Sequence, residues 1–412
     1  MRPVVWLVVL AACGGRPSVR EPDAPDTIDR RPPDSQRRYT IWLGGAQVGT
    51  AAETERWSAA GVALRRTEAL RFLRGDQEVA LTTAIEIDAS LSLVPTRVRW
   101  TESGLGSRTV EATHDATGWH LTLGDAHALP ATAIPAELVP LVVRRDGAFR
   151  GPVFLPARGF VAGTGRVEPV APQRLVARLD LDAGPIVEAT IDLGSDGTPL
   201  RVVDGEGVIA RRATDAQATA DFPLVDLIAA TSVPLTGVPS SRLALLGDLA
   251  VPAVPGQAPV AATAGLGLEL SPALPGDLPG GDAGPDRTRD IRALVAAVRA
   301  RIAPDLRAGS VRAHDVATAG DCTTFALAYS ALAARTGIPT HVVTGLRVDG
   351  RALVRHRWAV SWTGRAWIAV DAAFGAAPAG GDLIGLAIHG ADDAGLIAGE
   401  AALTRVRGAT WL

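Results

Sequence analysis

Three residues in the C-terminal part of the chain have the types and the order that nucleophilic acyl transfer requires. Cys322 opens an alanine-rich segment, and His356 and Asp371 follow in two later segments of apolar character. A histidine can take the proton of a thiol, and an aspartate behind it fixes the imidazole tautomer and stabilises the imidazolium. The chemistry depends on whether folding brings the three side chains together.

The segment around the thiol predicts a helix that begins at Cys322. Asp321 is a favourable N-cap, and the buried face of the helix is marked by Phe325, Tyr329 and Leu332 before Gly337 ends it. A thiol in the first turn faces the positive end of the helix dipole, so we expect its pKa to lie below the free value of ~8.5. The alternative is a small buried hydrophobe, and the local sequence favours neither.

Three strands are predicted after this helix, at 340–350, 351–362 and 366–375. If the turn around Gly364 has an even number of residues, Trp362 pairs with Trp367. His356 and Asp371 then share one face of the sheet, within side-chain reach of each other. An odd turn would place Asp371 on the opposite face.

These segments resemble the transglutaminase-like core of the papain-like cysteine acyl-transfer superfamily. The motifs occur in order: Gly-Asp-Cys-Thr at 320–323, Gly-Ile-Pro at 337–339, Val-Val-Thr-Gly-Leu at 342–346, His-Arg-Trp at 356–358 and Val-Asp-Ala-Ala-Phe-Gly at 370–375. The resemblance implies that Cys322, His356 and Asp371 form a catalytic triad. It also implies an α+β fold, in which a helix bearing the cysteine packs on an antiparallel sheet bearing the histidine and the aspartate.

The chain departs from the family pattern at two places. Arg357 stands where a small residue is common, and Ala-Ala follows Asp371 where Pro-Thr is common. Either change can reshape the rim of the site.

Other polar residues near the motifs receive no catalytic role. We expect His341 to be a solvated strand residue, whereas His314 and Asp315 precede the cysteine on a predicted loop and could line the site. A papain-type site would need an amide side chain, but the sequence has no asparagine and no glutamine after Gln257. The backbone N–H of Cys322 is one donor for an oxyanion, and a second is not identifiable.

The chain before this region has a different pattern. Apolar residues alternate from Tyr39 onward, which predicts an antiparallel β-rich region at 39–250. Segments 84–98 and 190–202 both run from a strand through a turn to Pro-x-Arg-Val, a weak internal repeat. The spacing of His114, His120 and His127 fits no common metal site, so no metal ligand and no cofactor is predicted.

Proline and glycine mark a boundary at 251–285, where 264–270 predicts one short strand. The transglutaminase-like domain is then predicted at 286–412. It begins with a helix whose apolar stripe is Ile291, Leu294, Val295, Val298 and Ile302, and Pro304 ends it.

The N-terminus predicts an envelope lipoprotein. Residues 1–12 read as a signal peptide, and Leu10-Ala11-Ala12-Cys13 resembles a lipobox whose cysteine is acylated. The alternative is an ordinary cleaved signal in which Cys13 has no role. Residues 13–38 are predicted to be a disordered tether. Gly14 favours the periplasmic face of the outer membrane.

Composition limits the remaining possibilities. The net charge of −3, with both signs scattered, gives no nucleic-acid footprint, and Cys322 has no other thiol to pair with once Cys13 carries lipid. The predicted function is a cell-envelope transglutaminase-like enzyme, which forms a thioester at an amide bond of a protein or cell-wall peptide and passes the acyl group to water or an amine. The alternative is a non-catalytic transglutaminase-like binding module.

Overall fold

The computed structural model describes residues 32–104, 107–122, 129–182, 186–195, 197–205, 207–279, 281–307 and 318–412. These residues form two compact units. The C-terminal unit comprises Leu73–Glu78 and Asp226–Leu412, and the β-rich unit comprises residues 32–72 and Val79–Val225. The predicted signal peptide, Cys13, His127, His314 and Asp315 lie outside the described residues.

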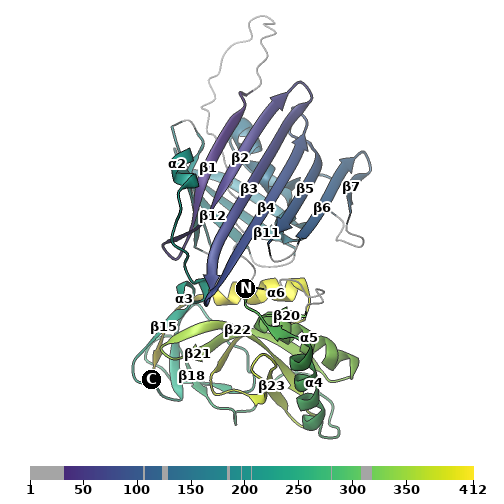
Figure 1. The fold of residues 1–412 in the computed structure, drawn as a ribbon, viewed down its shortest axis with the longest axis vertical. Coiled ribbons are helices and arrows are strands. Elements are labelled where there is room, and N and C mark those ends of the chain that lie inside the picture. Colours follow the sequence, from purple (N-terminus) through teal and green to yellow (C-terminus); the bar gives the residue numbers. More distant parts are fainter. Residues whose placement is uncertain are drawn as a thin grey trace, which may run out of the picture. The chain divides into compact units, whose positions relative to one another are not determined.

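The β-rich unit is built on a 14-stranded sheet in the order β7-β6-β5-β4-β3-β2-β1-β14-β13-β12-β11-β10-β9-β8. Neighbouring strands are antiparallel, apart from the parallel pair β8–β9. Figure 1 shows β1 to β6 side by side. The bounds are β1 (Ser35–Leu43), β2 (Ala46–Ser58), β3 (Gly61–Arg74), β4 (Gln77–Ala89), β5 (Pro95–Ser103), β6 (Ser107–Asp115), β7 (Gly118–Leu121), β8 (Ile134–Pro135), β9 (Phe149–Leu155), β10 (Val161–Ala171), β11 (Arg174–Leu181), β12 (Val187–Leu193), β13 (Pro199–Asp204) and β14 (Val208–Ala213). Short helices are η1 (Ala136–Leu138), α1 (Val139–Asp146), η2 (Pro156–Arg158) and α2 (Asp215–Thr219).

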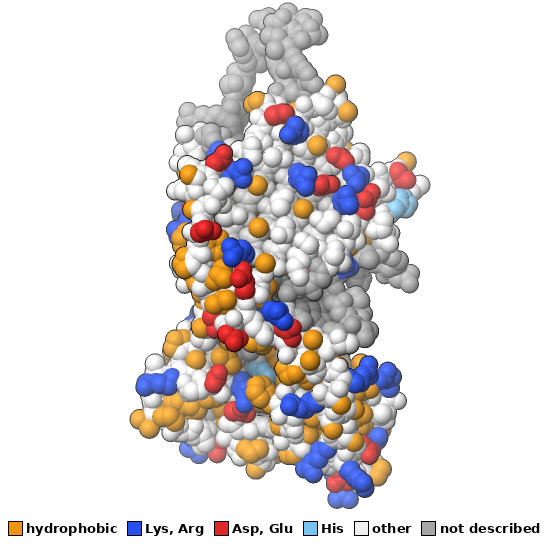
Figure 2. Space-filling model, in the orientation of Figure 1, with side chains coloured by type: hydrophobic (Ala, Val, Ile, Leu, Met, Phe, Trp, Pro, Cys, Tyr) orange, Lys and Arg blue, Asp and Glu red, His pale blue; other side chains and the backbone are white. Residues whose placement is uncertain are grey.

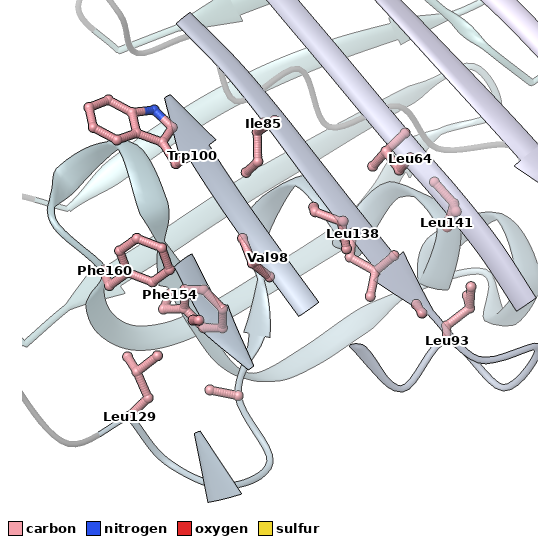
Figure 3. Close-up of a cluster of buried hydrophobic side chains, with 14 of the residues drawn as sticks. Leu64, Ile85, Leu93, Val98, Trp100, Leu129, Leu138, Leu141, Phe154 and Phe160 are labelled. Carbon is pink, nitrogen blue, oxygen red and sulfur yellow. The ribbon is translucent and has the colours of Figure 1, made fainter. Parts of the chain in front are cut away.

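The apolar face of strands β3 to β6 packs against the segment that contains α1 and β9. Figure 3 shows Val98 and Trp100 of β5 in the same cluster as Leu138, Phe154 and Phe160. The rings of Phe154 and Phe160 are stacked with centroids 5.6 Å apart. Burial of a large apolar side chain contributes roughly 1.5–3 kcal/mol, so the alternating pattern of these strands is what holds the unit together.

Strand β1 begins at Ser35, inside the segment predicted to be a tether. The prediction treated charged residues as unable to enter a core. Arg37, however, is 4% exposed, and its guanidinium donates to Glu53 at 3.0 Å and to Glu55. A buried charge is tolerated when it is paired and hydrogen-bonded, which explains the earlier start.

The two segments that the sequence groups as a repeat fold as similar hairpins. In β4–β5 and β12–β13, the pairing register shifts directly after an aspartate, Asp88 in the first hairpin and Asp192 in the second. The next residue then pairs with the proline of the Pro-x-Arg-Val motif, Pro95 or Pro199. The shared bulge gives both hairpins the same local bend.

The C-terminal unit combines helices with a mostly antiparallel ten-stranded sheet and is α+β, as predicted. The order is β17-β18-β16-β26-β15-β22-β21-β25, with β23 paired to β22 and β24 paired to β23. The strands are β15 (Val233–Thr236), β16 (Arg242–Gly247), β17 (Gln257–Val260), β18 (Leu266–Leu270), β21 (Thr340–Asp349), β22 (Ala352–Trp362), β23 (Trp367–Asp371), β24 (Ala376–Ala379), β25 (Leu383–His389) and β26 (Val406–Trp411). A separate short pair joins β19 (Ala303–Pro304) and β20 (Ala319–Gly320).

Four helices belong to this unit among the described residues: α3 (Leu227–Ala230), α4 (Thr288–Arg301), α5 (Cys322–Arg335) and α6 (Asp393–Leu403). Helix α5 packs on β22, β21 and α4, whereas α6 packs on β21 and β25. The predicted stripe of α4 faces this core, since Ile291, Val295 and Val298 are buried there with Phe325 and Tyr329 of α5. The thiol-bearing helix is thus fixed on two sides.

Basic and acidic side chains are interspersed over the face shown in Figure 2, without a large region of one sign. Within the described residues, no helix combines the length and the apolar character needed to cross a membrane.

Candidate active site

Helix α5 begins at Cys322, as the sequence predicts. Asp321 is its N-cap, and the carboxylate Oδ1 accepts a hydrogen bond from the backbone N–H of Thr323 at 3.0 Å. The helix ends at Arg335, and Gly337 takes a left-handed backbone with φ of 67°. The thiol therefore lies in the first turn, where the backbone N–H groups and the helix dipole favour an anion.

The strand register that the sequence leaves open is the even one. Trp362 pairs with Trp367 across the turn, and Ala359 pairs with Val370. This register places His356 of β22 and Asp371 at the end of β23 on the same face. His356 Nε2 and Asp371 Oδ2 are 2.8 Å apart, and the two side chains are 5% and 4% exposed.

The Cys322 thiol lies on the other side of the imidazole from Asp371. Cys322 and His356 share a side-chain hydrogen bond. Since Nε2 faces Asp371, the nitrogen left for the thiol is Nδ1. The structure thus brings the three residues together in the order thiol, imidazole and carboxylate.

The electrostatics of this chain favour a thiolate–imidazolium pair. Burial and the charge of Asp321 raise the pKa of the Cys322 thiol, whereas the hydrogen bond and the charge of His356 are among the influences that lower it, and the net pKa is lowered. Burial alone would lower the pKa of His356. Its hydrogen bonds to Asp371 and Cys322 reverse that effect and raise the pKa well above the usual value.

Two aromatic rings flank the imidazole. The ring of Trp358 is stacked at a centroid distance of 6.0 Å, and the ring of Phe374 meets His356 edge-on at 5.5 Å. Trp358 is 1% exposed, whereas Phe374 is 59% exposed. One ring fixes the imidazole from the core, and the other forms part of the rim.

Arg357 has a structural role that the sequence did not suggest. Its side chain is buried and donates to Thr344 Oγ1 at 2.8 Å, to Thr323 Oγ1 at 3.0 Å and to Glu400 Oε1 at 2.8 Å. These contacts join β22 to β21, to the first turn of α5 and to α6. The residue expected to alter the rim therefore holds the helix that carries the thiol.

A cavity of about 430 Å³ opens beside the thiol within the C-terminal unit. The charged or titratable side chains in its lining belong to Arg74, Asp321, Cys322, Arg355, His356, Arg357 and Glu400. The apolar part is larger and is contributed by Ile228, Pro304, Leu306, Phe325, Val354, Ala373, Phe374 and Leu403.

Sequence reasoning missed several of these residues. Glu400 of α6 and Thr344 of β21 carry no motif, and Arg74 lies 247 residues before Asp321. The pattern Gly-Asp-Cys identified the cap of the helix, but a capping aspartate does not reveal which cation pairs with it.

Among the histidines set aside from the sequence, His341, His114 and His120 are described, and His341, in the same unit as the cavity, does not line it. His341 is partly buried, with its ring 5.3 Å from that of Trp367, so it is less solvated than expected. His114 Nε2 contacts the carbonyl oxygen of Ala131, and His120 Nε2 is 3.2 Å from Asp115. In the described part of the chain, no three histidine, cysteine, aspartate or glutamate side chains are placed to hold a metal ion.

Comparison with known proteins identifies the region that contains this site. Residues 282–372 match the family model of the transglutaminase-like superfamily. No curated protein matches the chain. The crystal structure of a DUF1089 family protein from Pseudomonas aeruginosa shares 14% identity with a TM-score of 0.24, covering 44% of this chain and 95% of that chain. The segment that carries Cys322, His356 and Asp371 is therefore a transglutaminase-like domain.

Proposed function

We propose that this protein is a thiol-dependent enzyme that transfers or hydrolyses acyl groups at amide bonds, with Cys322, His356 and Asp371 as its catalytic residues. The observation that carries the proposal is the hydrogen-bonded series of the three side chains at the wall of a cavity. Transglutaminase-like domains include cysteine peptidases and acyltransferases, which agrees with this chemistry.

In the first step, the Cys322 thiolate attacks the carbonyl carbon of an amide, and the oxygen takes the negative charge. The backbone N–H of Cys322, in the first turn of α5, is the donor that we assign to that oxygen. The tetrahedral intermediate collapses when the C–N bond breaks and the imidazolium of His356 gives its proton to the leaving amine. The product is a thioester on Cys322 and a neutral imidazole.

In the second step, neutral His356 takes a proton from the incoming nucleophile as that nucleophile attacks the thioester. The C–S bond then breaks and the Cys322 thiolate is restored beside the imidazolium. Water yields a carboxylic acid, and an amine yields a new amide. Asp371 holds the imidazole in place and stabilises its cationic form in both steps.

We also propose where the enzyme works and on what. The apolar N-terminal run and Cys13 support a lipid-anchored protein of the cell envelope, on the periplasmic face of the outer membrane. The substrate is then a protein or a cell-wall peptide. The mainly apolar cavity lining supports an acyl donor with an apolar group beside the scissile amide.

The test measures the reactivity of Cys322 in the whole chain, purified from membranes in detergent. Iodoacetamide, a neutral reagent, is applied between pH 4 and pH 10, and alkylation is quantified on the tryptic peptide 313–335, which contains Cys322. We expect the reaction to persist well below the free-thiol value of ~8.5. In the His356→Ala variant, the rise of the alkylation rate with pH, called the rising limb below, should move to that value or above. Thermal unfolding checks that the variant is folded.

A second measurement does not depend on that variant. Acid quenching of the unaltered protein with a pool of glutamine-rich and cell-wall peptides should leave an acyl group on peptide 313–335, and Cys322→Ser should not yield this thioester. Added methylamine distinguishes the outcomes, because loss of ammonia with gain of methylamine indicates transfer and gain of water indicates hydrolysis. An ordinary thiol titration together with no acyl adduct would overturn the proposal and favour the binding module.

A further inference from the structure

The cap of the catalytic helix is also a negative charge beside the nucleophile. Asp321 is 4% exposed, and its charge opposes ionisation of the Cys322 thiol. One carboxylate oxygen is used for the cap, because Oδ1 accepts from the N–H of Thr323. The other oxygen, Oδ2, faces Arg74 at 2.6 Å.

Arg74 is the last residue of β3, directly before the turn to β4, and it lies in the segment Leu73–Glu78 of the C-terminal unit. The side chain of Arg74 is 7% exposed and that of Asp321 is 2% exposed, so water screens the pair little. A second guanidinium nitrogen of Arg74 donates to the carbonyl oxygen of Leu306. Two acceptors from different segments therefore fix the direction of this guanidinium.

The backbone beside Arg74 is anchored as well. Gly75, at φ of 66°, takes the left-handed conformation that the turn requires, and its N–H donates to Asp226 Oδ1 at 3.0 Å. The same oxygen caps helix α3 through the N–H of Ile228 at 2.9 Å. Leu73 also forms a β-bridge with Asp226. The position of Arg74 is thus set by its neighbours on both sides.

The other charged groups around the thiol already have partners. Glu400 accepts from Arg357 at 2.8 Å and lies 3.6 Å from Arg355, and His356 is paired with Asp371. None of these pairs includes Asp321, whereas Arg74 forms a close ion pair with it.

We propose that Arg74 is a positioning residue of the active site, which neutralises Asp321 and orients it as the cap of α5 so that Cys322 can ionise. The inference rests on the proposed function, because its consequence is the reactivity of that thiol. The hydrogen bonds given for Arg74 go to Asp321 and Leu306, and we assign its effect on the thiol to Asp321.

The test is a double-variant cycle on the alkylation profile of peptide 313–335 in the whole protein. Arg74→Met removes the charge at similar length and should move the rising limb of the alkylation rate upward by about one pH unit, because more of the negative charge of Asp321 then acts on the thiol and disfavours the thiolate. Arg74→Lys keeps the charge and should restore most of the profile. Asp321→Asn keeps a good N-cap and removes the negative charge.

In the Asp321→Asn background, Arg74→Met should cause no further shift. Arg242→Met is the matched control, since Arg242 pairs with Glu269 on the surface of the same unit at 3.4 Å and should leave the profile unchanged. If Arg74→Met does not fold, the double variant is compared with Asp321→Asn alone, because the negative charge of Asp321 is absent from both proteins.

An unshifted profile in folded Arg74→Met, or an equal shift with and without the Asp321 charge, would overturn the inference. So would a double variant whose limb lies well above that of Asp321→Asn alone. Failure of the proposed function is a different result, because it requires the alkylation profile to stay unchanged in the His356→Ala variant.

Discussion

Replacement of Asp371 by asparagine should remove most of the ionisation of Cys322 at neutral pH. Asparagine keeps the shape of the side chain but loses the negative charge that lies 2.8 Å from His356 Nε2. Both side chains are at most 5% exposed, so water cannot replace the missing charge well. The imidazolium is then disfavoured, and the thiolate loses its cationic partner.

The size of the effect follows from the geometry. Two charges centred ~4 Å apart attract by ~4 kcal/mol at an effective dielectric constant of ~20, which corresponds to about three pKa units. The amide oxygen of asparagine can still accept from Nε2–H, so we expect the pKa of His356 to fall by about two units. The imidazole then loses its proton before the thiol does, and the rising limb of alkylation moves towards ~8.5.

The assay is the rate of alkylation by iodoacetamide, followed on peptide 313–335 from pH 4 to pH 10. At pH 6, Asp371→Asn should react about a hundredfold more slowly than the unaltered protein. A change of two units in the pKa that governs thiolate formation changes the thiolate fraction about a hundredfold. Asp290→Asn is the control, because Asp290 is an exposed residue of α4 paired with Arg287 at 2.8 Å. A folded Asp371→Asn protein whose rising limb stays within about 0.3 pH unit would refute the reasoning, because a shift of two units is expected.

Three further outcomes test other parts of the C-terminal unit. Tyr329→Phe removes a buried hydroxyl that lies 2.8 Å from Ser361 Oγ, and should lower the free energy of unfolding in urea by about 1 kcal/mol. Phe374→Ala removes an exposed ring at the cavity rim and should raise KM severalfold with kcat and thermal stability little changed, whereas a large loss of kcat alone would contradict this role. Burial lowers the pKa of His389 to about 4, so the unfolded chain binds more protons between about pH 6.5 and pH 4. The free energy of unfolding should therefore fall as the pH decreases through that window. It should fall less in the His389→Gln variant.

The sequence was informative where a local pattern determines the structure. The cap at Asp321, the helix that starts at Cys322 and the three following strands depend on propensity and alternation over short segments, and each is present. The register of Trp362 and Trp367 was reduced to two possibilities, because the side-chain period of a strand is two. Only the length of the turn remained to be decided, and four residues occupy it, from Thr363 to Ala366.

The sequence was uninformative where a charged residue is buried by its partners. Arg37 was assigned to a tether because its neighbours are charged, yet two glutamates of β2 pair with it inside the sheet. Arg357 lines the cavity, but its guanidinium is also enclosed by Thr323, Thr344 and Glu400, which the sequence did not indicate. Hydropathy treats each residue separately, whereas the cost of burying a charge depends on groups that only the fold brings close.

Arg74 shows how far this limit extends into the active site. The Gly-Asp-Cys motif contains a conflict, because the aspartate that begins the helix also disfavours the thiolate next to it. A cation must offset that negative charge, and the one arginine of α5, Arg335, lies at the far end of the helix. Arg74 at the end of β3, 247 residues before Asp321, pairs with that aspartate. The motif therefore identifies the nucleophile, while the reactivity of that nucleophile depends on residues outside the segment 282–372 that matches the family.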